Sequence, residues 1–275
     1  MPFYTFGAGG GTPSNQDTSY EAHGFGVDGA GTIATAGGSA HTKGAWSSLG
    51  ITANEWSAIL LQFGMLSSGS HRALVDISFD GGVTANVPNL PVQQGTSGAW
   101  AVVRLPLTVP AGADIRFRIQ ASAGSLTQTM AVLGEVRSET SRPGYTTMTA
   151  LNAIDTANTR PSTINVPLTN AWVEVVPTSA AEYGALLAMV GDNGTLPATA
   201  QAGSIAIGVG AASSEVEVAR RGVHIATSQP VVRQGFMPLI EQKITSGSRL
   251  AMRAQAPTPG TDNLSPAIYG FSGTP

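Results

Sequence analysis

The sequence predicts an all-β protein that consists of two tandem jelly-roll-like β-sandwich domains produced by an internal duplication. Three observations support this: one stretch occurs twice, short apolar runs alternate with turn residues, and the composition is poor in charge. Charged residues make up 11% and apolar residues 42% of the 275 residues, which is too apolar for a disordered chain. Many small and β-branched residues between frequent turns favour strands.

The repeated stretch begins at Gly112 in the first copy and at Gly247 in the second. It reads Gly-Ala-Asp-Ile-Arg-Phe-Arg-Ile-Gln-Ala and then Gly-Ser-Arg-Leu-Ala-Met-Arg-Ala-Gln-Ala. Strand alternation predicts an inward face and an outward face for each copy. The inward residues are Ile115, Phe117, Leu250 and Met252, and the outward residues are Arg118, Gln120, Arg253 and Gln255. The outward side chains are either an interface contact or solvated surface.

The duplication sets the predicted domain boundaries. Residues 1–19 form an N-terminal arm, 20–137 the first sandwich, 138–144 a linker rich in Ser, Pro and Gly, and 145–275 the second sandwich. We expect the two copies to form a pseudo-two-fold protein. The arm carries Phe3, Tyr4 and Phe6, which either pack on the adjacent domain or dock on a neighbouring subunit.

Within the copies, matching segments predict matching strands. An Ala-Trp pair at Trp46 and at Trp172 precedes a Glu-aromatic-small-Ala run that ends at Gly64 and at Gly191. These short, turn-bounded runs favour buried strands, and we expect both Trp rings to fill the sandwich cores. The alternating segment 71–80 closes on an Asp-Gly turn, typical of a hairpin, and segment 204–210 is its counterpart. Val-Val-Arg recurs before Pro106 and before Pro238, which predicts strand ends or edges.

Composition excludes several classes of function. The formal net charge of −3 gives no basic patch for nucleic acid. The absence of cysteine excludes disulfides and cysteine-ligated zinc. No apolar run is long enough for membrane insertion, and the N-terminal residues predict no signal peptide. We therefore expect a protein made in the cytoplasm of the producing cell.

No motif for catalysis, cofactor binding or metal binding is present, and we predict no enzyme and no cofactor. The Gly24–Gly29 match to Gly-x-Gly-x-x-Gly lacks the following helix of a nucleotide site and favours a turn. The four histidines show no zinc spacing. Asp76 and Asp80 are a conceivable carboxylate pair for glycoside hydrolysis, but a solvated strand face is favoured. Asp80-Gly-Gly favours a turn over a calcium loop.

Carbohydrate binding is the most credible site-based function. Jelly-roll modules bind sugars on aromatic rings flanked by amides and acids, and the candidates are Trp56, Trp100, Tyr183 and Tyr269. The alternative is that these rings are core or interface residues, which Trp56 and Tyr183 favour because both lie in apolar runs.

The Thr-x-Ala-Trp openings, the Glu-aromatic-x-Ala runs and the closing Ala-Val-Leu-Gly134 and Ala-Ile-Tyr-Gly270 signatures resemble virion proteins of tailed bacteriophages and of phage-derived gene transfer agents. The resemblance is to head-fibre, decoration and tail-appendage proteins. It implies a non-enzymatic structural protein in the virion, made in the bacterial host cytoplasm, that contacts copies of itself and other virion proteins. The alternative is a carbohydrate-binding module that attaches a particle to host surface polysaccharide.

Overall fold

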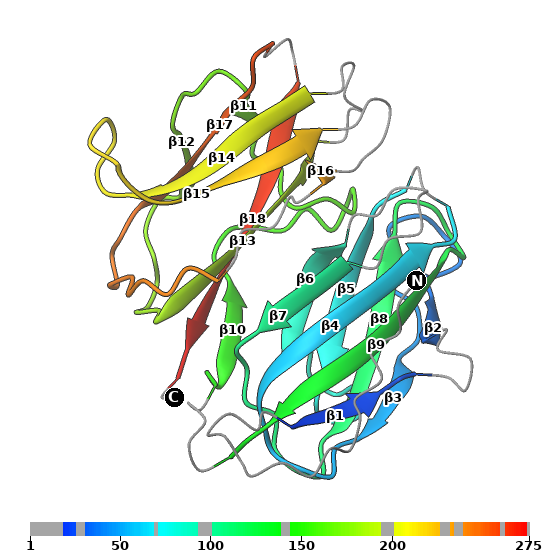
Figure 1. Ribbon diagram of the computed structural model, residues 1–275. Coiled ribbons are helices and arrows are strands. Elements are labelled where there is room, and N and C mark those ends of the chain that lie inside the picture. The colour runs from blue at the N-terminus through cyan, green and yellow to red at the C-terminus, as the bar shows by residue number, and fades with distance from the viewer. Residues whose placement is uncertain are drawn as a thin grey trace, which may run out of the picture.

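The structure of the protein is a computed structural model that describes residues 19–25, 31–68, 71–92, 101–138, 144–193, 201–225, 232–233, 239–258 and 262–273. Within these ranges every regular element is a β-strand and no helix occurs. The strands form four sheets, which pair into two β-sandwiches, at the lower right and upper left of Figure 1. The prediction of an all-β chain with two tandem sandwiches is therefore confirmed.

The strand order of the first sandwich is that of a jelly roll. Its described strands are β1 (Tyr20–His23), β2 (Thr32–Thr35), β3 (Ser47–Ile51), β4 (Trp56–Leu66), β5 (Ala73–Ser78), β6 (Val87–Val92), β7 (Ala101–Leu105), β8 (Asp114–Ala121) and β9 (Thr127–Val136). One sheet has the order β1–β9–β4–β7, with β2 also paired to β9, and the facing sheet has the order β3–β8–β5–β6. Most successive strands cross from one sheet to the other, as in double-sheet jelly rolls.

The second sandwich repeats this order. Its described strands are β10 (Thr147–Ala150), β11 (Val166–Pro167), β12 (Val173–Val176), β13 (Ala185–Asp192), β14 (Gln201–Val209), β15 (Val216–Ile225), β16 (Val232–Arg233), β17 (Leu250–Gln255) and β18 (Asn263–Ser272). One sheet has the order β10–β18–β11, with β13 also paired to β18, and the facing sheet has the order β12–β17–β14–β15–β16.

The hydrogen-bond register confirms the duplication residue by residue. β5 pairs with β8 so that Asp76 lies opposite Arg118, and β14 pairs with β17 so that Ala206 lies opposite Arg253. The repeated stretch forms β8 and β17, and its predicted inward residues are all buried: Ile115, Phe117, Leu250 and Met252. One strand departs from the pattern, because β7 pairs with β4 whereas β16 pairs with β15.

Strands β13 and β18 contribute to both hydrophobic cores of the chain. One set of their side chains fills the core of the second sandwich: Leu186, Ala188, Val190, Leu264 and Ile268. The alternate set joins the core of the first sandwich: Ala185, Leu187, Met189, Ala267, Tyr269 and Phe271. Because both faces of this strand pair are buried, the strands read as nearly continuous apolar runs.

The two sandwiches contact each other through different elements. The outer face of β13 and β18, strand β10 and the turn before β11 meet β6, β8 and the turn at His41 of the first sandwich (Figure 1). Tyr269 Oη donates to Asn89 O at 2.7 Å, and Gln120 Nε2 donates to Thr159 Oγ1 at 3.0 Å. A two-fold axis would bring the same elements of each copy together. The expected pseudo-two-fold arrangement is therefore wrong, and the sandwiches pack head to tail.

Strand β5 corrects a second expectation. Leu74, Asp76 and Ser78 alternate away from the core as predicted, but none is solvated: Asp76 is 1% and Ser78 0% exposed. Lys43 Nζ and Arg118 Nε lie 2.6 and 2.8 Å from Asp76 Oδ2, and they cover the carboxylate. The polar side chains predicted that this face is solvated, and the prediction is wrong because the face is covered by Lys43, Arg118 and the second sandwich.

Trp46 and Trp172 correct a third expectation. Both rings are half-buried and lie outside the cores, each beside an arginine of the repeated stretch. The guanidinium carbon of Arg118 lies 4.3 Å from the centre of the Trp46 ring, and that of Arg253 lies 4.6 Å from the centre of the Trp172 ring. The rings form cation–π stacks on the outer sheet faces.

Candidate functional site

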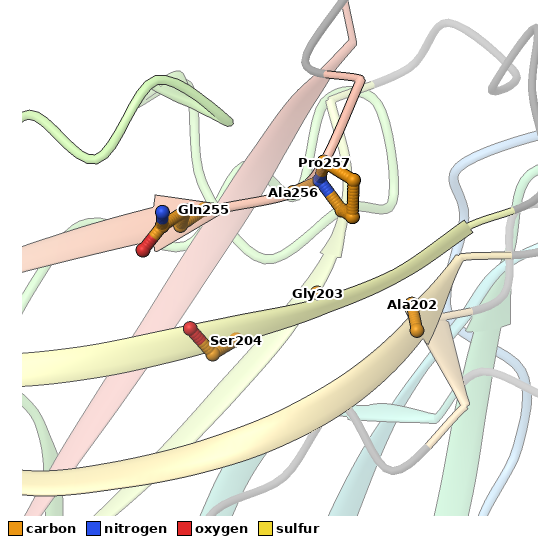
Figure 2. Close-up of a pocket in the computed structure, with 6 residues that line it drawn as sticks. All are labelled: Ala202, Gly203, Ser204, Gln255, Ala256 and Pro257. Carbon is orange, nitrogen blue, oxygen red and sulfur yellow. The ribbon is translucent and has the colours of Figure 1, made fainter.

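The candidate site is a hollow on the outer face of the second sandwich, between β14 and β17. These strands pair with Ser204 opposite Gln255. The hollow has a volume of about 310 Å³ and is lined by Ala202, Gly203, Ser204, Gln255, Ala256 and Pro257. Figure 2 shows the Gln255 amide and the Ser204 side chain on the neighbouring strands and the Pro257 ring at the strand end.

Small side chains open this hollow. A Cβ atom at Gly203 would lie 2.6 Å from Gln255 O, so the two backbones approach here as only glycine permits. The side chain of Gln255 is exposed, and no hydrogen bond joins it to another described residue. The lining is uncharged, with one amide and one hydroxyl, and it therefore suits neutral groups that donate and accept hydrogen bonds.

Two buried donors near the hollow lack an acceptor among the described residues. They are Gln201 Nε2 and Arg253 Nε. Gln201 Oε1 accepts from the backbone of Thr258 at 3.3 Å, directly after Pro257. Unpaired buried donors are uncommon, and these two belong to β14 and β17, the strands that line the hollow.

An ion-pair cluster borders the hollow. Arg253 Nη2 lies 2.7 Å from Glu217 Oε2, and Arg220 also binds Glu217, at 2.7 Å. The hydrogen bond from Arg220 lowers the pKa of Glu217 to about 2; burial opposes this shift, and the hydrogen bond from Arg253 adds to it. The ring of Trp172 lies against Gly208, where a Cβ atom would be 2.8 Å from Trp172 Cη2. The cluster holds Arg253 in place on β17, two residues before Gln255.

The first sandwich carries an equivalent glutamine, Gln120, whose side chain is bound by the second sandwich. Leu74 lies opposite Gln120 in the same register as Ser204 opposite Gln255. Gln120 is 2% exposed; its amide donates to Thr156 O and to Thr159 Oγ1 in the turn before β11. The repeated glutamine is thus an interface contact in one copy and exposed in the other. The first copy shows what the position binds: a peptide carbonyl and a hydroxyl.

The predicted carbohydrate-binding aromatics do not form a platform. Trp56, Tyr183 and Tyr269 are 0%, 4% and 0% exposed, so their rings cannot stack on a sugar. Trp56 Nε1 donates to Glu21 Oε2 at 3.0 Å. Burial raises the pKa of Tyr269 well above its usual value, and the charge of Asp76 adds to this. The platform prediction is wrong for these three residues, for which the core alternative holds.

The remaining predicted site residues lie outside the described residues. These are Trp100 and the three aromatics of the arm, Phe3, Tyr4 and Phe6. The sequence did not single out the hollow, although it did show Gln255 as a repeated outward residue. The signal that could have found it is the size of two side chains: Ser204 and Ala206 are smaller than Leu74 and Asp76, which occupy the equivalent positions of the first copy.

The carboxylates considered for catalysis are both engaged in structure. Asp76 Oδ1 accepts from Asn89 N at 2.8 Å, while its other oxygen binds Lys43 and Arg118. Asp80 Oδ1 accepts from Ser78 Oγ at 2.6 Å and from backbone groups of its turn, and these bonds lower the pKa of Asp80 to about 2. Both carboxylates are therefore held by contacts within the fold.

The described ranges contain neither a cluster of metal-ligating side chains nor an apolar membrane-spanning helix. No group of three or more His, Cys, Asp or Glu side chains there is arranged to hold a metal ion. None of the described elements is a helix with the length and apolar character needed to cross a membrane.

Comparison with known proteins adds likenesses of fold alone. No family model matches the chain, and no curated protein matches it by sequence. A crystal structure of PNGF-II aligns over 84% of this chain with 10% identity and a TM-score of 0.36, and the chain spans 60% of its length. The N-terminal CBM22-1–CBM22-2 tandem domain of Xyn10C from Paenibacillus barcinonensis aligns over 94% of each chain with 11% identity and a TM-score of 0.26.

A third likeness is to a chain in the atomic structure of Sulfolobus Turreted Icosahedral Virus. It covers 98% of this chain and 100% of that one, with 10% identity and a TM-score of 0.19. The TM-scores of all three structures lie too low for any of them to indicate a function for this chain.

Proposed function

We propose that the chain is a non-enzymatic structural protein of a phage-type virion, which assembles on a capsid or tail as a decoration, fibre or spike-base protein. The observation that carries the proposal is the head-to-tail packing of two jelly rolls. Strands β13 and β18 of the second sandwich pack against the first sandwich, so that both faces of this strand pair are buried. Such a chain consists of two jelly-roll modules joined by a buried contact, an arrangement suited to building and covering surfaces. The resemblance of its repeated segments to virion proteins of tailed phages supports the same role.

The interior supports a scaffold role. Buried carboxylates are neutralised by cations and backbone donors: Asp76 by Lys43 and Arg118, and Asp155 by Arg160 at 2.5 Å. Sites that carry out proton transfer keep a group with an open position toward the substrate. Among the described acidic residues, the buried ones are bound on all sides by the fold itself.

The test is to purify particles from the strain that encodes the chain and to detect the protein by labelled antibody in electron micrographs. Label at regular positions on the particles is the expected result. Label that stays in the particle-free fraction, together with a protein that remains monomeric, would contradict the role.

Carbohydrate binding is the second candidate, and the hollow at Ser204 and Gln255 favours it. An amide and a hydroxyl beside a proline ring provide hydrogen bonds and an apolar contact for a sugar. The test is retention on an array of host surface polysaccharides, with Gln255→Ala as the variant and Trp56→Phe as a core control. Loss of retention in the first variant alone supports the site, and absence of retention by the unaltered protein removes this candidate.

A further inference from the structure

The contact between the two sandwiches uses two different surfaces, and each has a counterpart on the other sandwich. The giving surface is the outer face of β13 and β18, and its counterpart is the outer face of β4 and β9. The receiving surface includes β5, β6 and β8, and its counterpart is the outer face of β14, β15 and β17. The chain uses one surface of each kind internally, and the other two belong to β14–β15, at the upper left of Figure 1, and to β4–β9, at the lower right.

The counterpart of the giving surface is outward-facing and partly apolar. Leu60 lies opposite Leu133 in the register in which Leu187 lies opposite Tyr269. Three large apolar side chains of the same sheet are exposed: Tyr20 is 47%, Ile33 58% and Val102 42% exposed. Ile33 and Val102 alternate with residues of the core, so both point away from it. Exposed apolar groups gathered on one face of a sheet mark an interaction surface.

The counterpart of the receiving surface is the hollow at Ser204 and Gln255. Its equivalent in the first sandwich is filled by the turn that Gln120 binds. In the second sandwich Ser204 replaces Leu74, Ala206 replaces Asp76, and Gln255 keeps the amide without a described partner. The site thus retains the glutamine of the internal contact, and none of the described residues binds its side chain.

Both free surfaces carry ion pairs, and the one on the first sandwich stands where the buried counterpart has an apolar residue. Arg104 pairs with Glu135 on the first sandwich at 2.7 Å, and Glu135 stands where Phe271 stands in the buried face. Arg220 pairs with Glu217 beside the hollow. Contacts between chains that also exist apart are more polar than permanent ones. The charges therefore fit a contact between separate molecules.

We propose that a second copy of this chain docks the outer face of its β4–β9 pair on the β14–β17 hollow of the first copy. The inference deepens the proposed structural role and rests on it for its biological setting. The contact is heterologous, so it repeats from copy to copy and produces a ring or an open filament. It does not duplicate every internal contact, because β16 pairs with β15, whereas β6 is the last of the described strands in its sheet. The contact centres on the hollow.

Three variants of the full chain test the proposal. The face variant combines Ile33→Arg with Val102→Arg and places charge on the giving surface. The hollow variant, Ser204→Arg, fills the receiving surface. Val83→Arg is the matched control, since Val83 is 86% exposed on a turn outside both surfaces. Thermal unfolding of each variant checks that the fold is kept, and sedimentation velocity over a concentration series measures assembly.

The unaltered protein and Val83→Arg are expected to form larger species as concentration rises, and the face and hollow variants are each expected to stay monomeric. Mixed in equal amounts, the two monomeric variants should form a one-to-one dimer and nothing larger, because each keeps one working surface and they are complementary. A monomer at every soluble concentration of the unaltered protein overturns the proposal, as does a mixture of folded variants that does not dimerise.

The outcome is independent of the test of the structural role. A monomer that labels particles overturns the copy-to-copy contact and leaves the role standing. A protein that assembles through these surfaces but is never detected on particles overturns the structural role and leaves the copy-to-copy contact standing.

Discussion

The indole ring of Trp56 on β4 lies directly over Gly134 on β9. A Cβ atom at Gly134 would be 1.9 Å from Trp56 Cδ2, and in the second sandwich a Cβ atom at Gly270 would be 2.4 Å from Tyr183 Cδ1. In each sandwich the aromatic ring therefore packs on the glycine of the closing signature: Trp56 on Gly134, and Tyr183 on Gly270. The two signatures form one contact in each sandwich.

This contact predicts that Gly134→Ala lowers the free energy of unfolding of the first sandwich by about 3 kcal/mol, because a methyl group overpacks a fully buried ring. Gly270→Ala should have a similar effect on the second sandwich. Urea denaturation followed by Trp fluorescence measures the first, and circular dichroism both. Gly38→Ala is the control, since its Cβ meets no atom within 4 Å. Equal effects of all three substitutions would contradict the account.

The buried ion pairs of Asp76 predict that replacing this one carboxylate lowers the stability of the protein strongly. Asp76→Asn removes a buried negative charge and leaves Lys43 and Arg118 without their carboxylate, which should destabilise the protein by about 3 kcal/mol. Glu55→Gln, in the exposed pair with Arg137, should cost less than about 1 kcal/mol. Chemical denaturation measures both, and a loss of stability for Glu55→Gln as large as that for Asp76→Asn would contradict this reading of the β5 face.

Tyr269 predicts a link between the sandwiches. Tyr269→Phe removes the donor to Asn89 O and leaves this carbonyl unpaired in the contact, at an expected loss of about 1–3 kcal/mol. Because the bond crosses between domains, the two unfolding transitions should separate further in calorimetry than in the unaltered protein. Tyr145→Phe is the matched control, because the Tyr145 ring also lies near Phe271 but the hydrogen bond to Asn89 O comes from Tyr269. An unchanged transition in Tyr269→Phe would show that the bond does not couple the sandwiches.

Glu21 predicts an acid dependence. Burial opposes its ionisation, but hydrogen bonds from Ala53, Trp56, His23 and Asn54 lower the pKa of Glu21 from 4.5 to about 2. The folded pKa lies below the unfolded one, so this stabilisation is fully present above about pH 4.5 and is lost as the pH falls through about 2.

The test of this dependence is the melting temperature of Glu21→Gln against that of the unaltered protein. The variant should melt lower at about pH 6, and the difference should shrink to nearly zero at about pH 2. Other low-pKa acids such as Glu217 affect both proteins alike, so the difference isolates Glu21. A difference that stays constant with pH would show that the ionised carboxylate does not provide the stabilisation.

Local sequence patterns predicted the strands and their inward faces, because alternation and turn residues act over short distances. Ile115 and Phe117, with Leu250 and Met252, are the clearest cases. The same reasoning failed for Asp76, whose burial depends on Lys43, Arg118 and a neighbouring domain far along the chain. The prediction that the Trp46 ring fills the core failed as well, since an amphipathic ring is equally suited to a core or to stacking on Arg118.

The candidate site was harder to predict than the fold. Gln120 and Gln255 are identical in type and register, yet one is buried under the second sandwich and the other is open. The difference lies in which faces of the sandwiches meet, and no local pattern encodes it. The identical Val-Arg pairs of β7 and β16 show the same limit, because these strands pair with different sheets.

Cryo-electron microscopy of particles from the producing strain tests the central claim most directly, because it shows both the role and the geometry. We predict density for tandem jelly rolls in which the β4–β9 face of one copy covers the β14–β17 hollow of the next. Particles that lack this density while the protein is present in the same cells would contradict the structural role, and copies joined through other surfaces would contradict the head-to-tail contact.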